Sequence, residues 1–157
     1  MKSESEMLST LAKYCSIAER CLLDVRKKIQ QEALSANEEK RIIEKLLHEK
    51  FIDEKRYARH FVHDKFYLNH WGRIKIGYEL KIRDIPTEVS QEAIASIDED
   101  EYLKTLTVLL AQKKRTIKGH SPQDSYHKLF RFASTKGFET VLIIKILTKL
   151  LGNINDD

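Results

Sequence analysis

The chain carries one apolar pattern three times, and this repeat limits the folds that it can adopt. Leu34, Ile85 and Phe138 hold the same place in each copy and lie 51 and 53 residues apart. The other members stand nine and five positions before each of these anchors and nine and twelve positions after it: Val25, Ile29, Ile43 and Leu46; Ile76, Leu80, Ile94 and Ile97; Leu129, Ala133, Leu147 and Leu150. Such a period indicates one supersecondary unit used three times. It suits a long binding surface better than a catalytic pocket.

The apolar residues of each copy follow helical spacing, and the whole chain has only two prolines. This pattern predicts about nine helices in three sets of three, with no strand. We expect an all-α fold of three tandem three-helix repeats, similar to helix-turn-helix units, that form an elongated, curved array. The expected domains are residues 1–52 (an N-terminal helix and the first repeat), 53–97 (the second repeat) and 98–157 (the third repeat).

Capping residues predict where several helices begin and end. Ser16, followed three residues later by Glu19, has the form of a capping box and predicts a helix start. Helix starts are also expected at Asp53, at Asp98 and at Ser121, which precedes a proline. Gly137 is expected to end a helix in the left-handed conformation.

Charge is unevenly distributed, although the net charge is only +4. Residues 56–83 hold seven basic and two acidic side chains, and residues 104–136 hold eight basic and one acidic. Between them, residues 84–101 hold seven acidic side chains and no basic one. Two basic blocks therefore flank an acidic belt, and their local fields are stronger than the net charge suggests.

Ten basic side chains of these blocks are candidates for contact with phosphates or with an acidic protein groove. They are Arg56, Arg59, Arg73, Lys75, Lys81, Arg83, Lys113, Lys114, Arg115 and Lys118. A solvated surface is the alternative, because Lys75, Glu79 and Arg83 have the i, i+4, i+8 spacing at which helical side chains pair with each other.

Few features of the sequence favour catalysis or a metal. It has neither a nucleophile elbow nor a phosphate-binding glycine loop. His60 and His63 are close enough on a helix to share a metal, but no further ligand has a suitable spacing. We expect a protein that is not an enzyme, with no cofactor and no metal.

The sequence also predicts a cytoplasmic protein that does not enter a membrane. The first residues are polar and acidic, unlike a signal peptide, and the apolar runs are far too short to cross a bilayer. Cys15 and Cys21 are six residues apart and are expected to be reduced thiols of the core.

A helix-turn-helix transcriptional regulator is the alternative function. Such a protein places a basic, polar third helix in the major groove of DNA. The third helices expected here do not have this character: residues 87–92 are acidic, and residues 141–144 are apolar. The sequence therefore favours repeats that pack against each other over repeats that read base edges.

Three segments resemble the signatures of the RecX family. Residues 47–62 are similar to its first signature. They have a leucine, a turn, the run aromatic-aliphatic-Asp-acidic, then Arg, an aromatic residue and Ala, and later Phe-Val. Residues 71–85 are similar to its second signature, with a glycine, basic residues and Glu-Leu, and residues 132–138 to its third, which ends in a basic residue, glycine and phenylalanine. The resemblance covers about residues 15–150. Lys50 and Asp84 stand where the family usually has glycine at the turn.

The resemblance implies a regulator of the RecA recombinase that is not an enzyme. Members of the family bind the RecA–DNA filament along its helical groove. They typically limit filament extension, ATP hydrolysis, strand exchange and the co-protease activity that triggers the SOS response. We accordingly expect the RecA filament as partner, weak and non-specific contact with DNA, and a monomer. The ten basic side chains named above would make these contacts.

Overall fold

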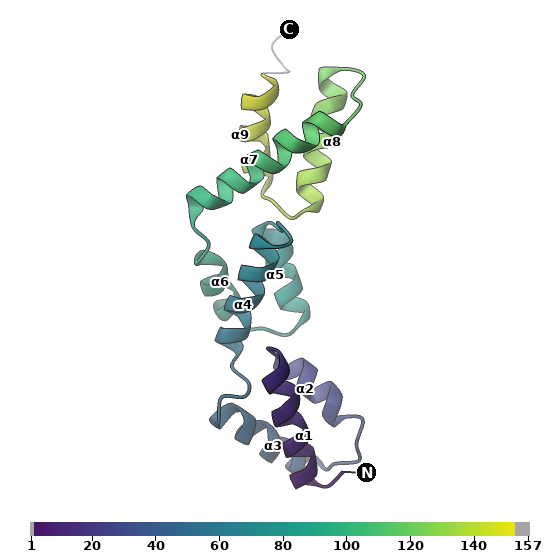
Figure 1. Cartoon of the computed structure of the whole chain (residues 1–157), viewed down its shortest axis with the longest axis vertical. Coiled ribbons are helices and arrows are strands. Elements are labelled where there is room, and N and C mark those ends of the chain that lie inside the picture. Colours follow the sequence, from purple (N-terminus) through teal and green to yellow (C-terminus); the bar gives the residue numbers. More distant parts are fainter. Residues whose placement is uncertain (1, 153–157) are drawn as a thin grey trace. The chain divides into compact units, whose positions relative to one another are not determined.

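The computed structural model describes residues 2–152 of the chain. Within this range it has nine α-helices and no strand (Figure 1). The helices are α1 (Glu4–Ile17), α2 (Leu22–Ile29), α3 (Ala36–His48), α4 (Glu54–Tyr67), α5 (Arg73–Ile82), α6 (Thr87–Ala95), α7 (Glu99–Thr116), α8 (Pro122–Thr135) and α9 (Thr140–Leu151). The predicted all-α class is confirmed, as are the helices in sets of three. The elongated, curved form of the array and the proposed domain borders stay predictions.

The repeated apolar pattern forms the interior of the helical sets. All of its members are buried except Leu34, Ile94 and Leu150, which are half-buried. Burying one such aliphatic side chain contributes roughly 1.5–3 kcal/mol. The same positions therefore stabilise each of the three sets, which explains the spacing of the repeat.

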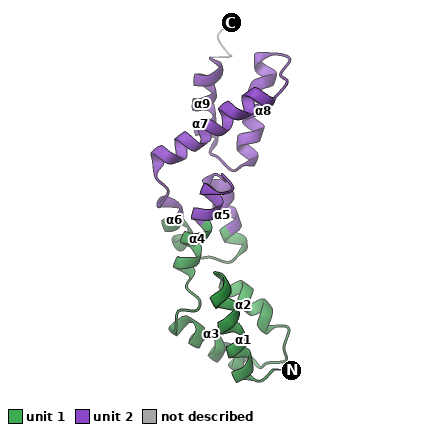
Figure 2. Cartoon of the chain, in the orientation of Figure 1, with its two compact units in different colours: residues 1–61, 80–93 green, residues 62–79, 94–157 purple. Residues whose placement is uncertain are grey.

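The chain divides into two compact units (Figure 2). Unit 1 comprises residues 1–61 and 80–93, and unit 2 comprises residues 62–79 and 94–157. The borders fall inside α4, α5 and α6, so each unit includes part of the middle helices. Among the described residues, no helix has both the length and the apolar character that crossing a bilayer requires.

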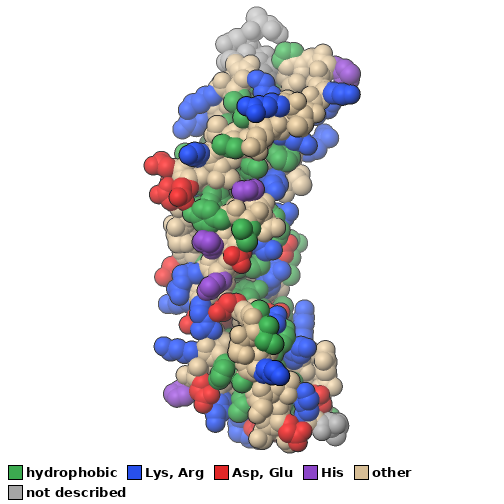
Figure 3. Space-filling view, viewed as in Figure 1, with side chains coloured by type: hydrophobic (Ala, Val, Ile, Leu, Met, Phe, Trp, Pro, Cys, Tyr) green, Lys and Arg blue, Asp and Glu red, His purple; other side chains and the backbone are tan. Residues whose placement is uncertain are grey.

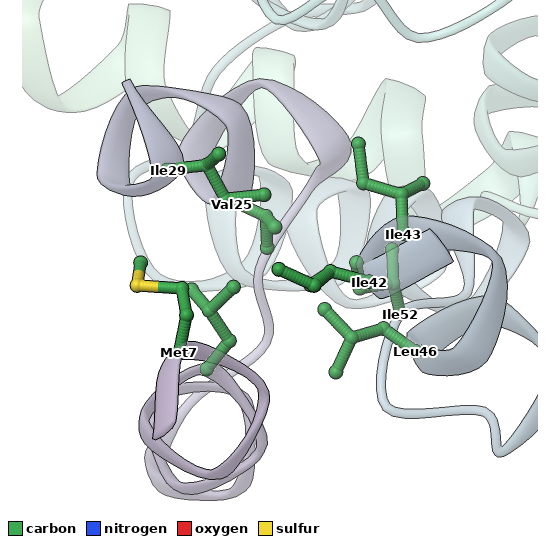
Figure 4. Close-up of a cluster of buried hydrophobic side chains, with 8 residues drawn as sticks. Met7, Val25, Ile29, Ile42, Ile43, Leu46 and Ile52 are labelled. Carbon is green, nitrogen blue, oxygen red and sulfur yellow. The ribbon is translucent and has the colours of Figure 1, made fainter. Parts of the chain in front are cut away.

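The core of unit 1 forms where α1 packs against α2 and α3. Side chains from all three helices point toward one another there, as Figure 4 shows, and Ile52 closes the cluster after α3. The buried members are Met7, Leu11, Val25, Ile29, Ile42, Ile43, Leu46 and Ile52. Cys15 and Cys21 in this unit are free thiols, as expected, and Cys21 is buried.

In unit 2, α7, α8 and α9 pack against one another, and aromatic rings fill the space beside them. The ring of Tyr102 on α7 lies 5.6 Å from that of Phe66 and 5.2 Å from that of Phe138, between centroids. All three side chains are buried. These rings join the end of α4 and the α8–α9 turn to the first turn of α7.

Most of the predicted helix starts are confirmed. The side chains of Asp53, Asp98 and Ser121 accept the backbone N–H groups of Arg56, Glu101 and Asp124. The start predicted at Ser16 is wrong. α1 continues to Ile17, and the hydroxyl of Ser16 donates to the carbonyl oxygen of Lys13. α2 begins instead after the buried Cys21, whose N–H donates to the carboxylate of Asp24 (3.1 Å). The carboxylate of Glu19 is held by Arg56 and does not cap a helix.

Three helices end in a left-handed residue followed by a buried or half-buried apolar one. Lys50 after α3, Asp84 after α5 and Gly137 after α8 have φ of 60°, 58° and 95°. At each end, the N–H of this residue and the next N–H donate back to carbonyl oxygens in the last turn, which is the Schellman arrangement. The prediction for Gly137 is confirmed. Lys50 and Asp84 adopt the conformation for which glycine is the usual residue.

Candidate functional site

The two units divide the ten predicted contact residues between them. Unit 1 holds Arg56, Arg59, Lys81 and Arg83, and unit 2 holds Arg73, Lys75, Lys113, Lys114, Arg115 and Lys118. Their environments differ widely, from open solvent to half-buried ion pairs. The contact role of all ten stays a prediction, but the structure shows which of them already have partners inside the protein.

Arg56 lies in the first turn of α4 and joins that helix to earlier parts of unit 1. Its Nε lies 2.6 Å from Oε1 of Glu19. Its terminal nitrogens donate to the carbonyl oxygens of Lys50 (3.0 Å) and Phe51 (3.4 Å). The other carboxylate oxygen of Glu19 is buried and has no hydrogen-bond partner. This side chain therefore stabilises the α3–α4 connection, and binding a ligand would compete with these contacts.

The remaining basic candidates of unit 1 are more accessible. Arg59 on α4 and Lys81 on α5 are exposed. The guanidinium carbon of Arg83 lies 4.7 Å from the centroid of the Phe61 ring, a cation–π distance. Among the candidates of this unit, Arg59 and Lys81 are consequently the side chains that an outside anion reaches most easily.

Arg73, at the start of α5, is the centre of a polar network in unit 2. Its guanidinium pairs with Glu99 and with Glu139, the latter at 2.8 Å, and lies 3.8 Å above the ring of Tyr102. Only 23% of the side chain is exposed. Arg73 therefore links α5 to the beginnings of α7 and α9.

Tyr102 completes this network from inside the core. Its hydroxyl donates to Glu139 and accepts the backbone N–H of Arg73 (2.9 Å). Burial, followed by the hydrogen bond to Glu139, raises the pKa of Tyr102 well above its ordinary value. The N–H groups of Gly72 and Ile74 donate to the carbonyl oxygens of Lys136 and Gly137. Three of the free amides at the start of α5, those of Gly72, Arg73 and Ile74, are thus satisfied by the α8–α9 turn and by Tyr102.

Lys75, one turn into α5, lies beside Trp71. Its Nζ is 4.4 Å from the centroid of the indole ring, and Nζ of Lys65 on α4 is 4.7 Å from the same centroid. All three side chains are half-buried. The sequence analysis did not name Lys65 or Trp71 as site residues, and it missed that the fold brings them together with Lys75.

The basic end of α7 is the densest group of candidates in unit 2, and we define it as Lys113, Lys114, Arg115 and Lys118. Lys113 lies with its Nζ 5.1 Å from the centroid of the Phe132 ring, and Lys114 donates to the carbonyl oxygen of Leu150 (3.3 Å). The others are exposed. Figure 3 shows Lys and Arg side chains over this part of the visible face and acidic ones near the start of α7. Both placements complement the helix dipole, so they also favour stability.

The solvent side of α5 carries apolar side chains that the sequence analysis did not single out. Ile74, Tyr78 and Ile82 follow i, i+4, i+8 spacing and are 57%, 64% and 50% exposed. The opposite side of the same helix buries Ile76 and Leu80. A helix that is apolar on both sides is typically covered on both sides. The signal was present in the sequence, because apolar residues occur at almost every second position of α5.

The structure also bears on the other kinds of site considered. Within residues 2–152, no three His, Cys, Asp or Glu side chains are grouped as metal ligands would be. The third helix of the middle set, α6, presents Glu88 and Glu92 to solvent, and α9 presents Val141 and Ile144. Acidic and apolar surfaces of this kind do not complement the edges and phosphates of DNA.

The sequence is similar to that of known proteins over most of its length. A family described as RecX, second three-helix domain, matches residues 53–94. Regulatory protein RecX of Clostridioides difficile (strain 630) is 25% identical over 133 residues, which cover 82% of this chain. The match covers 63% of that relative, so the chain spans less than two thirds of its length.

Solved structures share the fold. The crystal structure of RecX from Lactobacillus salivarius matches with a TM-score of 0.83 and 19% identity, over 94% of this chain and 96% of its own. A second crystal structure, of regulatory protein RecX, matches with a TM-score of 0.83 and 20% identity, over 91% of this chain and 72% of its own. Residues 53–94 thus match the second three-helix domain of the RecX family, and the chain as a whole shares the fold of the solved RecX structures. The resemblance found in the sequence is thereby confirmed.

Proposed function

We propose that this protein binds the RecA–DNA filament and limits its activities: filament extension, ATP hydrolysis, strand exchange and co-protease function. The match of residues 53–94 to the RecX family supports this proposal, and so does the name of the relative from Clostridioides difficile, regulatory protein RecX. In this role the protein acts by binding and carries out no chemistry of its own. A transcriptional regulator is the alternative function, but the acidic outer side of α6 does not favour it.

One observation supports the proposal most strongly. The solvent side of α5 has exposed apolar residues with a basic residue beside them. Ile74 and Tyr78 offer apolar area that a protein partner can bury, and Lys75 lies beside them in the first turn. Protein interfaces typically have an apolar centre with charged groups at the rim. An acidic groove on a recombinase filament fits this combination, because basic rim residues increase the rate and specificity of docking.

Binding to the filament can be measured directly with fluorescently labelled protein and anisotropy. We expect tight binding to RecA assembled on single-stranded DNA and much weaker binding to RecA alone or to the DNA alone. A transcriptional regulator would instead prefer one duplex sequence over unrelated ones, by more than roughly 10³-fold. Equal binding to the filament and to bare DNA would contradict the proposal.

The basic end of α7 provides the variant for this test. Replacing Lys113, Lys114 and Arg115 with Ala should weaken filament binding by about tenfold, at roughly 0.5 kcal/mol for each lost ion pair. The inhibition of RecA should weaken with it, and its dependence on salt should flatten. Helix content measured by circular dichroism should not change. Exposed Lys27, Lys40 and Lys45 of unit 1, replaced together, remove the same charge and serve as the control. Equal effects of both triple variants would remove the basic end of α7 from the site.

A further inference from the structure

Two lysine side chains lie at the indole ring of Trp71 in unit 2, and a third lysine lies close to one of them. The ammonium groups of Lys65 and Lys75 lie 4.7 Å and 4.4 Å from the centroid of the ring. Lys136 donates a 2.9 Å hydrogen bond from its Nζ to the carbonyl oxygen of Asn69, two residues before the tryptophan. We call Lys65, Trp71, Lys75 and Lys136 the Trp71 lysine cluster. Its residues come from α4, the α4–α5 turn, α5 and the end of α8, so only the fold brings them together.

Helix dipoles account for two of the three charges but not for the third. Lys65 is in the last turn of α4, and Lys136 follows the last turn of α8, where the negative end of a helix favours a cation. Lys75 is in the first turn of α5, at the positive end, and that turn has no acidic residue. The dipole of α5 therefore does not favour a lysine there.

Lys75 and Lys136 also repel each other. Burial lowers the pKa of Lys136, and the nearby ammonium of Lys75 lowers it further. Like charges held this closely in a half-buried setting destabilise the free protein. An anion between them would relieve the repulsion and would gain from all three charges. Residues that cost stability in the free protein are typical of binding sites.

The side chains, and not the backbone, would hold this anion. The first two amides of α5 already donate, that of Ile74 to the carbonyl oxygen of Gly137 and that of Arg73 to Tyr102. A phosphate offers more acceptor oxygens than a carboxylate and can therefore bridge several ammonium groups. An indole ring next to lysines that bind phosphates offers a surface on which a nucleobase can stack. The combination favours a nucleic acid over an acidic peptide.

We propose that the Trp71 lysine cluster binds the backbone of a single-stranded nucleic acid, with the lysines on its phosphates and Trp71 against a base. On binding, the ammonium groups of Lys65 and Lys75 exchange the indole ring for phosphate oxygens. The site deepens the proposed function, on which it rests, because Lys75 is one of the residues expected to meet the RecA–DNA filament. It adds three residues to that surface: Lys65, Trp71 and Lys136.

Intrinsic fluorescence tests this proposal, because Trp71 is the only tryptophan of the chain. The full chain, without RecA, is titrated with three probes: single-stranded oligothymidylate, inorganic phosphate and polyglutamate. We expect oligothymidylate to quench the fluorescence through base stacking. Inorganic phosphate should bind far more weakly, because it has no base and a single phosphate. Polyglutamate should leave the signal nearly unchanged.

Glutamine variants assign the binding to the lysines. Lys65→Gln, Lys75→Gln and Lys136→Gln should each weaken oligothymidylate binding by roughly fivefold, the upper range for an exposed ion pair. Each should also lower the slope of log K against log salt by about 0.7. Lys104→Gln, at an exposed position of α7 in the same unit, should change neither quantity by as much. Three separate variants keep the test decisive if one of them fails to fold.

Two results would overturn the proposal. One is the absence of quenching by oligothymidylate, or quenching that the three cluster variants leave as strong as Lys104→Gln does. The other is equally tight binding of polyglutamate, which would assign the cluster to an acidic protein. Since RecA is absent from these titrations, either result leaves the filament proposal to its own test. Failure of filament binding together with normal quenching would refute only the filament proposal.

Discussion

The turn between α5 and α6 and the turn between α8 and α9 follow the same backbone path with different residues at its central position. Asp84 and Gly137 are both left-handed, with φ of 58° and 95°. In both turns the next residue, Ile85 or Phe138, donates its N–H back to the last turn of the helix and is buried. The same hydrogen bonds thus form with aspartate in one turn and with glycine in the other.

The surroundings of the two turns explain this difference. A Cβ atom on Gly137 would lie 2.3 Å from Cβ of Lys75 and 2.6 Å from its backbone nitrogen. On the other side of the contact, a Cβ atom on Gly72 would lie 2.3 Å from the carbonyl oxygen of Gly137. Asp84, in contrast, is exposed. The turn itself tolerates a side chain at moderate cost, whereas the close approach of α5 to the α8–α9 turn requires glycine.

Of the substitutions in these two turns, Gly137→Ala should reduce the free energy of unfolding most. It combines a left-handed alanine, at about 1–3 kcal/mol, with a clash against backbone that has no room to move, at about 1–3 kcal/mol more. We expect the free energy of unfolding to fall by about 4 kcal/mol in urea titrations followed by circular dichroism. A loss below about 1 kcal/mol would show that α5 does not approach the turn this closely.

Tyr102→Phe should loosen the start of α5 from the same turn without adding any atom. The change leaves the N–H of Arg73 and a half-buried carboxylate oxygen of Glu139 without the hydroxyl, at about 2 kcal/mol. Urea unfolding at neutral pH measures the loss. An unchanged midpoint would mean that water replaces the hydroxyl and that the network contributes little.

The loss of stability at high pH should distinguish the buried tyrosine of unit 1 from that of unit 2. Burial raises the pKa of Tyr57 in unit 1 to about 12, and the pKa of Tyr102 in unit 2 is raised further. Below the ordinary tyrosine pKa of 10.0 both phenols are protonated in the folded and the unfolded chain, and the stabilisation is fully present. Above it only the unfolded chain loses the protons, so stability falls as pH rises from about 10.

Phenylalanine variants of the two tyrosines show how much each residue contributes to this decline in stability. Each phenol contributes at most about 1.4 kcal/mol per pH unit. Tyr102→Phe should flatten the decline over a wider pH range than Tyr57→Phe, because the pKa of Tyr102 is raised more. The two variants should differ only above pH 12, so unfolding free energies measured between pH 9 and pH 13 test this order, and a steeper decline in either variant would contradict it.

Asp84→Gly should have the smallest effect and the opposite sign. Glycine relieves the left-handed strain of about 1 kcal/mol but gives the unfolded chain more freedom, so we expect a net gain of about 0.5 kcal/mol. Thermal unfolding should show a slightly higher Tm, and Asp84→Ala should lower it. If glycine destabilises this turn, the carboxylate of Asp84 makes a contribution that outweighs the strain.

Local patterns in the sequence predicted much of this fold. The spacing of Val25, Ile29 and their counterparts predicted the buried positions, and Gly137 predicted a left-handed helix end. The resemblance to the RecX family marked Lys50 and Asp84 as turn positions. The start predicted at Ser16 failed because a capping box is only one of several ways to begin a helix, and Glu19 pairs with a residue 37 positions away.

The environments of the candidate site residues were less predictable, because the partners come from distant parts of the chain. Arg73 was grouped with the exposed cations, but it pairs with Glu99 and Glu139, 26 and 66 residues further on. No helical spacing rule detects such pairs. The same holds for Lys136, which lies 67 residues from Asn69 in the sequence and bonds to it in the fold. Charge blocks predict where cations are plentiful, but only the fold shows which of them are engaged.

The measurement that most directly tests the central claim is ATP hydrolysis by RecA on single-stranded DNA in the presence of substoichiometric amounts of this protein. A regulator that binds the filament should lower the rate well before the two proteins are equimolar, because one bound molecule affects many RecA subunits. An ATPase rate that is unchanged up to equimolar protein would contradict the account.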